Sequence, residues 1–357
     1  MAEDGLSDMK FLAIEHELPT RQVTNDEVVA NVRQASAQHL SPSELDTLEQ
    51  LMWDCFQSAG TQVRYHRADG ESAVALATAA GERALATAGV DRRDIDLVLY
   101  VGIGRGVVEP ASANIYQDTL GLSRATAFDV LDACASWTRA LQLARLFLDS
   151  GTYRTIMILN AECVGCESHR YELTSVREFA HWHPAITIGE AATATIVTAS
   201  SEPDDFETTF RTWGQKRDLC FVPLPNFDGY FGKAVDVDGG IKPLQFVSFG
   251  LRLMEFGSRK LIEHYHAYPQ FEEFKADIVF THSASDGMSS YAAEACRIDP
   301  EKLRLSHQRY ANTISASLPL GMSEAIKDGT LNDGDRVLLL TASAGVTTAL
   351  TKFVFHN

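Results

Sequence analysis

One cysteine, Cys134, stands where a catalytic nucleophile would be expected, in the sequence TAFDVLDACASWTRALQLARLFLDSG. The residues before it have the β-branched and apolar character of a strand, and small residues flank the sulfur. After it, apolar residues repeat at helical intervals, at Trp137, Ala140, Leu141, Ala144 and Leu148. We therefore expect Cys134 at the N-terminus of a helix, where free backbone amides and the helix dipole lower the pKa of a thiol. The alternative is a core cysteine, because free cysteines are often buried.

Two other residues have side chains suited to work beside a thiolate. His282 follows the apolar strand sequence ADIVFTHS, and open α/β sheets usually bind ligands where such strands end. Asn312 lies in RYANTISASLPL, just before an apolar helical segment. When a thiolate attacks a thioester, an imidazole and an amide can both hydrogen-bond to the carbonyl oxygen on which charge develops. For His282 alone, a hydrogen-bonded core histidine is the alternative.

The two halves of the chain repeat one order of elements. A helix, a charged turn and an apolar strand headed by Asp96 recur as a helix, a turn and a strand headed by Asp277. Cys134 follows the first aspartate by 38 residues (134 − 96), and Asn312 follows the second by 35 (312 − 277). A glycine then comes 17 residues later in each half, in DSGT and KDGT (151 − 134 and 329 − 312). The pattern predicts a duplicated α/β fold in which Cys134, His282 and Asn312 converge.

Composition limits the possible partners. The 357 residues are 45% hydrophobic, enough for one large α/β domain or two halves of ordinary size. The net charge of −17 argues against nucleic acid, which is bound through clustered Lys and Arg. No apolar run is long enough to span a bilayer, and no export signal opens the sequence, so we expect a soluble cytoplasmic protein without a membrane partner. Six cysteines in this length fit reduced thiols.

Two further motifs suggest cofactors, and neither is complete. The glycines of GIGRG at 102–106 are followed by VVEP, whereas a dinucleotide-binding fingerprint leads straight into a helix. Potential zinc ligands with close spacing are Cys163, Cys166, His169, His181 and His183. No second cysteine pair completes a four-ligand site, so structural thiols are the preferred interpretation. We predict neither a cofactor nor a metal ion.

The predicted organisation follows the repeat. Residues 1–200 form an N-terminal half with the nucleophile, and residues 248–357 form a C-terminal half with His282 and Asn312. The segment 201–247 between them is rich in turn formers and aromatic residues. It is predicted to link the halves and to make a surface excursion that could cover a substrate entrance.

Over nearly its whole length the sequence resembles the thiolase-like condensing enzymes of the ketoacyl-acyl-carrier-protein synthase III branch. The motifs are FDVLDACASW, HSAS, RYANTISASLPL and DGTLNDGDRVLLLTASAG. The resemblance implies a duplicated five-layer α-β-α-β-α fold, usually a homodimer. It also implies that Cys134 accepts the acyl group and that His282 and Asn312 stabilise the oxyanion. The implied substrates are thioesters of CoA or phosphopantetheine, supplied as acyl-CoA or on an acyl carrier protein.

The sequence departs from this family at three places. Ser343-Ala344-Gly345 replaces a glycine triplet whose amide joins that of Cys134 in an oxyanion hole, so Ala344 becomes the expected backbone donor. Ser285 replaces an asparagine. Glu109, in VVEPASA, replaces an aromatic residue and resembles a glutamate thought to act as a base in head-to-head olefin-pathway condensing enzymes. Glu109 could equally be a helix N-terminal charge beside Pro110.

Four functions are compatible with these residues, and the leading one is condensation of two acyl thioesters, as in fatty-acid or polyketide biosynthesis. Transfer of the acyl group to a hydroxyl or an amine would use the same Cys134 and His282. A cysteine hydrolase has the same order of Cys, His and Asn, but the sequence lacks the papain signature and the duplication does not suit that fold. A non-catalytic subunit that pairs with an active relative would not need the intact trio.

Overall fold

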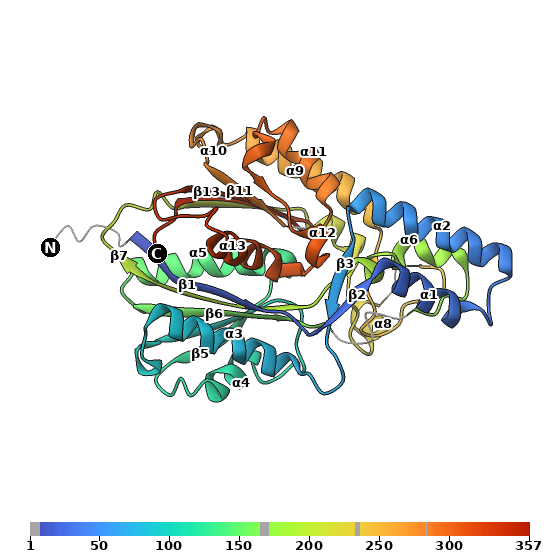
Figure 1. The fold of residues 1–357 in the computed structure, drawn as a ribbon, viewed down its shortest axis with the longest axis horizontal. Coiled ribbons are helices and arrows are strands. Elements are labelled where there is room, and N and C mark those ends of the chain that lie inside the picture. Colours follow the sequence, from blue (N-terminus) through green and yellow to red (C-terminus); the bar gives the residue numbers. More distant parts are fainter. Residues whose placement is uncertain (1–7, 165–170, 233–235, 283) are drawn as a thin grey trace.

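The computed structural model describes residues 8–164, 171–232, 236–282 and 284–357, and it contains two five-stranded sheets (Figure 1). The first sheet has the order β1-β7-β6-β4-β5, with β1 Asp8–Glu17, β4 Leu97–Val101, β5 Thr126–Val130, β6 Thr155–Glu162 and β7 Ala191–Ser200. The second has the order β12-β11-β13-β14-β8, with β8 Glu207–Thr212, β11 Ile278–Thr281, β12 Leu303–Arg304, β13 Arg336–Ser343 and β14 Thr347–Val354. Read from β5 and from β12, the two orders are the same.

Strand directions confirm the duplication. In both sheets the first three strands are parallel, and the last two each run antiparallel to their neighbour. The matched aspartates also have matched contacts: the Asp96 carboxylate accepts the backbone N–H of Arg154 just before β6, and the Asp277 carboxylate accepts that of Arg336 at the start of β13. The predicted repeat is therefore present in both backbone and side chains.

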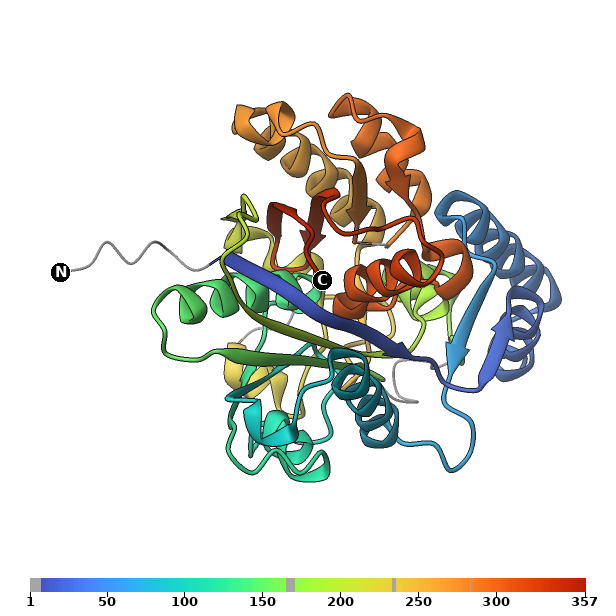
Figure 2. The same ribbon diagram turned by 60° about the vertical axis from the view of Figure 1, so that its left-hand side comes forward.

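Helices complete five layers (Figures 1 and 2). The inner layer is α5 Ser136–Asp149 and α13 Ser317–Lys327, the outer layer on the first sheet is α3 Ala73–Ala88 and α4 Ser112–Thr119, and that on the second is α9 Gly250–His266, α10 Pro269–Glu273 and α11 Asp286–Ala295. Apolar residues of both inner helices and both sheets form one buried cluster, with Trp137 and Leu141 of α5 and Leu318 and Met322 of α13 at its centre. The predicted five-layer thiolase-like fold is confirmed.

A smaller unit stands beside the sheets. It contains α1 Asn25–Ser36, α2 Pro42–Ala59, α6 Phe179–Trp182, α7 Pro184–Thr187 and α12 His307–Tyr310, with the strand pair β2 Arg21–Thr24 and β3 Val63–His66. A capping box fixes the start of α2, where Ser41 and Glu44 satisfy each other's backbone N–H groups. Leu48, Met52 and Phe56 of α2 pack on Trp182. This packing holds α2 over the edge of the pocket described below.

The segment predicted as a linker, 201–247, has a more complex structure. Its first part contains β8, which pairs with β14 as an edge strand of the second sheet. The described remainder contains β9 Cys220–Phe221 and the short helix α8 Phe227–Phe231, and β9 pairs with β10 Val247–Ser248. In the described residues, no helix is both long and apolar enough to cross a bilayer.

Candidate active site

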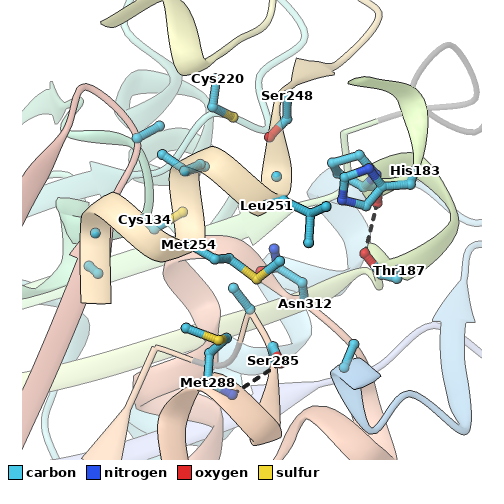
Figure 3. Close-up of a pocket in the computed structure, with 18 of the residues that line it drawn as sticks. Cys134, His183, Thr187, Cys220, Ser248, Leu251, Met254, Ser285, Met288 and Asn312 are labelled. Atoms are coloured by element: carbon cyan, nitrogen blue, oxygen red, sulfur yellow. Dashed lines mark hydrogen bonds between the residues drawn. The ribbon is translucent and has the colours of Figure 1, made fainter. Parts of the chain in front are cut away.

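Cys134 lies in a tight turn, Ala133–Ala135, that leads from β5 into α5. Ala133 has φ of +45°, in the left-handed region that non-glycine residues rarely adopt. The Ser136 hydroxyl holds this turn: it donates to the Ala133 carbonyl (2.6 Å) and accepts the Asp132 N–H (2.8 Å). Figure 3 shows the sulfur of Cys134 directed into a pocket.

A residue of the second half fixes the same turn from the other side. The Ser343 hydroxyl, at the end of β13, accepts the Ala135 N–H at 3.3 Å and donates to the Asp132 carbonyl at 3.2 Å. The next residue, Ala344, directs its backbone at the Cys134 sulfur as a hydrogen-bond partner of the thiolate. The replacement of the glycine triplet thus leaves a backbone donor beside the sulfur. Its action on an oxyanion stays a prediction.

The predicted lowering of the Cys134 pKa is wrong for the free enzyme. Burial raises the pKa of this thiol, and the neighbouring Cys220 and Glu162 add to the shift. Backbone and hydroxyl hydrogen bonds from Ala344 and Ser343 lower it, but by less. Desolvation outweighs the donors at the helix start because the sulfur faces an apolar enclosure. Without a ligand, Cys134 is therefore a neutral thiol.

His282 follows β11 directly and is buried. Its ring Nδ1 lies 2.9 Å from the Ser317 hydroxyl, at the start of α13. Burial, together with the nearby His307, lowers its pKa to about 4, although the Ile314 backbone raises it. His282 is therefore neutral near pH 7.

Asn312 is held through its side-chain oxygen and its backbone, and among the described residues no hydrogen bond from its Nδ2 is found. Its Oδ1 accepts the Ile314 N–H at 2.9 Å, while its own backbone bonds to Thr187 and Gly189. This leaves Nδ2 on the pocket side as a donor. Asn312 does not, however, occupy the position that Cys134 has in the first half, because the matching turn is Ile314–Ala316 and the residue matched to Cys134 is Ser315. Helix α13 has 11 residues and α5 has 14, so the glycine after α13 comes three residues sooner after Ser315 than Gly151 does after Cys134. Asn312 lies three residues before Ser315, and its distance to that glycine therefore equals the 17 residues from Cys134 to Gly151.

The predicted trio lines one cavity of about 750 Å³, together with Ala344. Figure 3 shows two of the trio, Cys134 and Asn312, in this cavity. Most of the remaining wall was not predicted from the sequence. It includes Leu51 and Cys55 of α2, Leu251 and Met254 of α9, Met288 and Ala292 of α11, and Cys220, Ser248 and His183. The apolar spacing of these helices could have indicated that they pack, but not that they leave a space between them. The walls are mainly aliphatic and thioether side chains, which suit an acyl chain.

Glu109 lies apart from this cavity within one chain. It is exposed, in the loop between β4 and α4, next to Val108, whose side chain is 72% exposed. Helix α4 begins at Ser112, after Pro110, so Pro110 precedes the first helical residue rather than occupying it. The expected base role of Glu109 depends on a second subunit, because its own pocket does not include it.

The glycines of GIGRG have a packing role. A side chain at Gly102 would collide with the Glu162 carboxylate, and one at Gly104 with the Ala161 carbonyl. The buried Glu162 accepts backbone N–H groups from Ile103 and Gly104 and the Ser315 hydroxyl. The loop is therefore tied to the start of α13, not shaped around a phosphate.

The proposed metal ligands fall in different places. Cys163 is buried just after β6, while Cys166 and His169 lie outside the described residues. His181 packs on Phe249, and His183 lines the cavity. Among the described residues no three His, Cys, Asp or Glu side chains group as a metal site.

Sequence comparisons place these features in a family. The family model described as 3-oxoacyl-[acyl-carrier-protein (ACP)] synthase III matches residues 128–214, and the one for its C-terminal part matches residues 270–353. The β-ketoacyl-[acyl-carrier-protein] synthase III of Clostridium beijerinckii is 24% identical over 97% of this chain and 99% of that protein. The corresponding synthase III 2 of Vibrio vulnificus is 28% identical over 76% of this chain and 72% of that protein.

Solved structures with the same fold include two kinds of enzyme. A variant of Xanthomonas campestris OleA superposes with a TM-score of 0.82 at 19% identity, covering 98% of this chain and 99% of that one. The 3-oxoacyl-[acyl-carrier-protein] synthase III of Aquifex aeolicus gives 0.78 at 22% identity, covering 98% and 100%. A cysteine-to-serine variant of OleA that was crystallised with lauric acid and lauroyl-CoA gives 0.81 at 20% identity, covering 98% and 100%. In sequence, this chain is thus similar to the ketoacyl-acyl-carrier-protein synthase III branch of the thiolase-like condensing enzymes, and its fold is the one that these enzymes share.

Proposed function

We propose that this enzyme transfers an acyl group to Cys134 and then joins it to the α-carbon of a second thioester. The observation that carries the proposal is the convergence of Cys134, His282 and Asn312 on one cavity of about 750 Å³ with largely apolar walls. In such a space, hydrogen-bond donors stabilise a developing oxyanion strongly because water does not compete for it. Thioesters of CoA or of a carrier-protein phosphopantetheine are the proposed substrates, and no cofactor is needed for this chemistry.

The two steps use the residues differently. In the first, the Cys134 sulfur attacks the thioester carbonyl, the bond to the departing thiol breaks, and the proton of Cys134 leaves with that thiol. In the second, a carbanion of the second substrate attacks the acyl carbon, the bond from that carbon to the Cys134 sulfur breaks, and the released sulfur takes up the proton removed from the α-carbon. His282 and the Asn312 Nδ2 stabilise the charge on the second substrate's carbonyl oxygen. The raised pKa of Cys134 requires that proton removal accompany attack.

The cavity favours acyl groups longer than acetyl. From Cys134 it reaches Leu51 of α2 and Ala292 of α11, and it passes Met254 and Met288, whose flexible side chains adapt to different chains. Cavities of this size normally enclose most of a drug-sized ligand.

The central test is covalent labelling of Cys134 by acyl-CoA thioesters of increasing chain length. We expect one acyl adduct in the intact mass, mapped to Cys134 by peptide analysis, and none in Cys134→Ala. The neighbouring thiol Cys220 is the internal comparison, because it lines the same cavity and burial raises its pKa to about 11. An adduct that remains in Cys134→Ala or maps to Cys220 would contradict the assignment.

We further propose that the enzyme is a homodimer in which Glu109 of one subunit removes the α-proton above the other subunit's Cys134. The supporting observations are the exposure of Glu109 beside the exposed Val108 and Leu131, and the position of β5 as an edge strand with an open side in the described structure. Exposed apolar side chains at a sheet edge favour association with another copy. Enclosure in that interface would raise the basicity of the carboxylate.

Glu109→Gln separates this role from a structural one. The variant keeps the size of the side chain and removes its basicity, so Cys134 should still be acylated while condensation falls about a hundredfold. Condensation is measured as product formed from two equivalents of acyl-CoA, with malonyl-CoA as the alternative donor. Unchanged condensation, or a strict requirement for malonyl-CoA, would instead support a decarboxylating synthase.

A further inference from the structure

One face of helix α9 lines the cavity from the surface of the protein to its interior. Leu251, at the start of the helix, is 79% exposed, whereas Ser258 and Leu261 are only 8% and 5% exposed. Met254 and Gly257 lie between them on the same face, because residues three or four positions apart share one side of a helix. The stretch from Leu251 to Leu261 spans about 15 Å. The cavity therefore has an open end at Leu251 and a buried end at Leu261.

The buried end lies between α9, α11 and the outer face of the second sheet. We call it the inner branch, and it is lined by Gly257, Ser258, Leu261, Thr281, Ser289 and Leu340. Leu261 and Leu340 also belong to the buried apolar cluster that holds α9 and α11 on this sheet. Since the CoA or phosphopantetheine arm of a thioester must reach solvent, that arm occupies the open end. The inner branch is then the space for an acyl chain.

Gly257 is the first unusual residue of the inner branch. It lies in the interior of α9, where glycine is less favourable than alanine. Close packing does not require it: an added Cβ would lie 3.6 Å from the Ala342 Cβ, an ordinary contact, and among the described residues no other element comes within 4 Å of it. Gly257 also lacks a positive φ that would demand glycine. What the missing side chain provides is space inside the branch.

Ser258 brings a polar group into the same apolar space. It lies on the cavity face of α9 between Met254 and Leu261, and among the described residues its hydroxyl has no hydrogen-bond partner. On the opposite wall, Thr281 donates to the Ser289 hydroxyl at 2.9 Å. Buried polar groups are normally hydrogen-bonded. A purely hydrocarbon chain would leave the Ser258 hydroxyl unpaired, whereas an oxygen on the chain would pair with it.

We infer that the inner branch selects acyl chains that carry a hydroxyl or keto oxygen on a mid-chain carbon. Gly257 provides the room for the chain, and Ser258 provides the hydrogen bond to that oxygen. Ala342, which faces Gly257, is two residues before Ala344, so the oxygen lies about 7 Å along β13 from the backbone that bonds to Cys134. The inference rests on the proposed function, because the chain must be one that Cys134 accepts.

The test uses thioesters that differ by one oxygen. Lauroyl-CoA competes at equal concentration with hydroxylauroyl-CoA thioesters whose hydroxyl is moved along the middle of the chain, and the ratio of acyl adducts on Cys134 is read from the intact mass. We expect the wild-type enzyme to favour the matching hydroxylated chain about tenfold, because the plain chain leaves a buried hydroxyl unpaired. Equal labelling at every hydroxyl position would overturn the inference and assign the Ser258 hydroxyl to water.

Ser258→Ala tests the source of the preference. It should bring the ratio of the two adducts to about one, and Ser258→Thr, which restores a hydroxyl, should recover the preference. Ser290→Ala is the matched control, because it removes an exposed hydroxyl of α11 that does not line the cavity. A preference that persists in Ser258→Ala, or that is lost equally in Ser290→Ala, would contradict the role of Ser258.

Gly257→Leu tests the role of the space. It should lower labelling by lauroyl-CoA relative to acetyl-CoA about tenfold or more, and Gly257→Ala should act in the same direction with a smaller effect. Gly321→Ala is the control for replacing a helix glycine, because Gly321 of α13 does not line the cavity and an added Cβ there makes ordinary contacts. An unchanged ratio of long to short chains in both Gly257 variants would exclude the inner branch as the acyl site.

Binding without acyl transfer separates this inference from the proposed function. Cys134→Ala cannot form an adduct but keeps the inner branch, so calorimetry of this variant with the same pairs of thioesters measures recognition alone. Preferred binding of a hydroxylauroyl thioester, without any adduct on wild-type Cys134, would refute the proposed function and support the inner branch. An adduct on Cys134 with no preference in either measurement would refute only the inference.

Discussion

The turns that precede the two inner helices have the same backbone conformation but carry different side chains. The turn before α5 presents Cys134 to the cavity, whereas the matched residue before α13, Ser315, is buried and bonded to Glu162 and Asn160. The second half contributes its functional amide from Asn312, three residues before Ser315. The duplicated scaffold thus supplies two equivalent turns, and of these two the first alone places its central residue, Cys134, in the cavity.

The contrast extends to what each turn does with its neighbours. The first turn is fastened to the other half through Ser343, and its own serine is satisfied by backbone groups. The second turn is fastened through Glu162, and its serine, Ser317, contacts the imidazole of His282. In the proposed reaction, one half therefore exposes the reactive sulfur, while the other supplies the groups that hydrogen-bond to substrate.

The largest expected effect comes from removing the donor of the second half. Asn312→Asp keeps an oxygen that can accept the Ile314 N–H but replaces the Nδ2 donor with a second oxygen. Condensation should fall about a hundredfold to a thousandfold, the usual loss for one preorganised oxyanion donor. Rapid-mixing measurements should find acylation of Cys134 nearly normal, and Asn312→Ala should behave in the same way. Slow acylation with normal condensation would reverse the roles of the two halves.

An intermediate effect is expected where the halves are joined. Ser343→Ala removes the hydroxyl that contacts the Ala135 N–H and the Asp132 carbonyl, while that N–H keeps its bond to the Asp132 carbonyl, so the free energy of unfolding should fall by about 0.5–1.5 kcal/mol. Urea denaturation measures this loss. Ser150→Ala, which removes an exposed hydroxyl just after α5, should change stability by less than about 0.5 kcal/mol. Equal effects in the two variants would show that Ser343 does not fasten the turn.

The effect that is smallest near neutral pH concerns a buried histidine outside the site. His264 of α9 bonds to Thr348, and burial lowers its pKa from 6.5 to about 4. As pH falls through this range the unfolded chain is protonated first, so the free energy of unfolding should decrease by about 1.4 kcal/mol per pH unit from this group. His264→Gln should remove about one proton from the pH dependence of urea midpoints. The control is His266→Gln, in the same helix but exposed, and a slope unchanged in His264→Gln would contradict the burial effect.

The sequence predicted the architecture well because the fold is duplicated. The two halves show the same order of apolar strands and helices, each with an aspartate, Asp96 or Asp277, before the matched strand. An element predicted in one half is therefore supported by its counterpart in the other. Cys134, His282 and Asn312, which were named from the sequence, do line one cavity. Cys134 follows strand β5 and His282 follows strand β11, so the ends of apolar strands were a useful guide to the site.

Three features could not be predicted from the sequence. The thiol pKa depends on how far desolvation outweighs nearby donors, and that balance depends on packing around Cys134. The shorter length of α13 could not be seen, because Asn312 lies as far before Gly329 as Cys134 lies before Gly151, and this equal spacing matched Asn312 with Cys134 instead of Ser315. The cavity walls of α2, α9 and α11 depend on spaces left between helices, for which apolar periodicity gives no signal.

The inner helices also determine when during folding the site can form. Ala135 and Ser343 are 208 residues apart in sequence, and Asn160 and Ser315 are 155 apart, yet both pairs are bonded. Contacts between such distant residues form late, because the chain must close large loops before it gains them. A chain released before β13 is made would have Cys134 but not the residues that hold its turn. Acylation of Cys134 in a synthesis or refolding experiment would then serve as a clock, reporting the moment when the whole chain has come together.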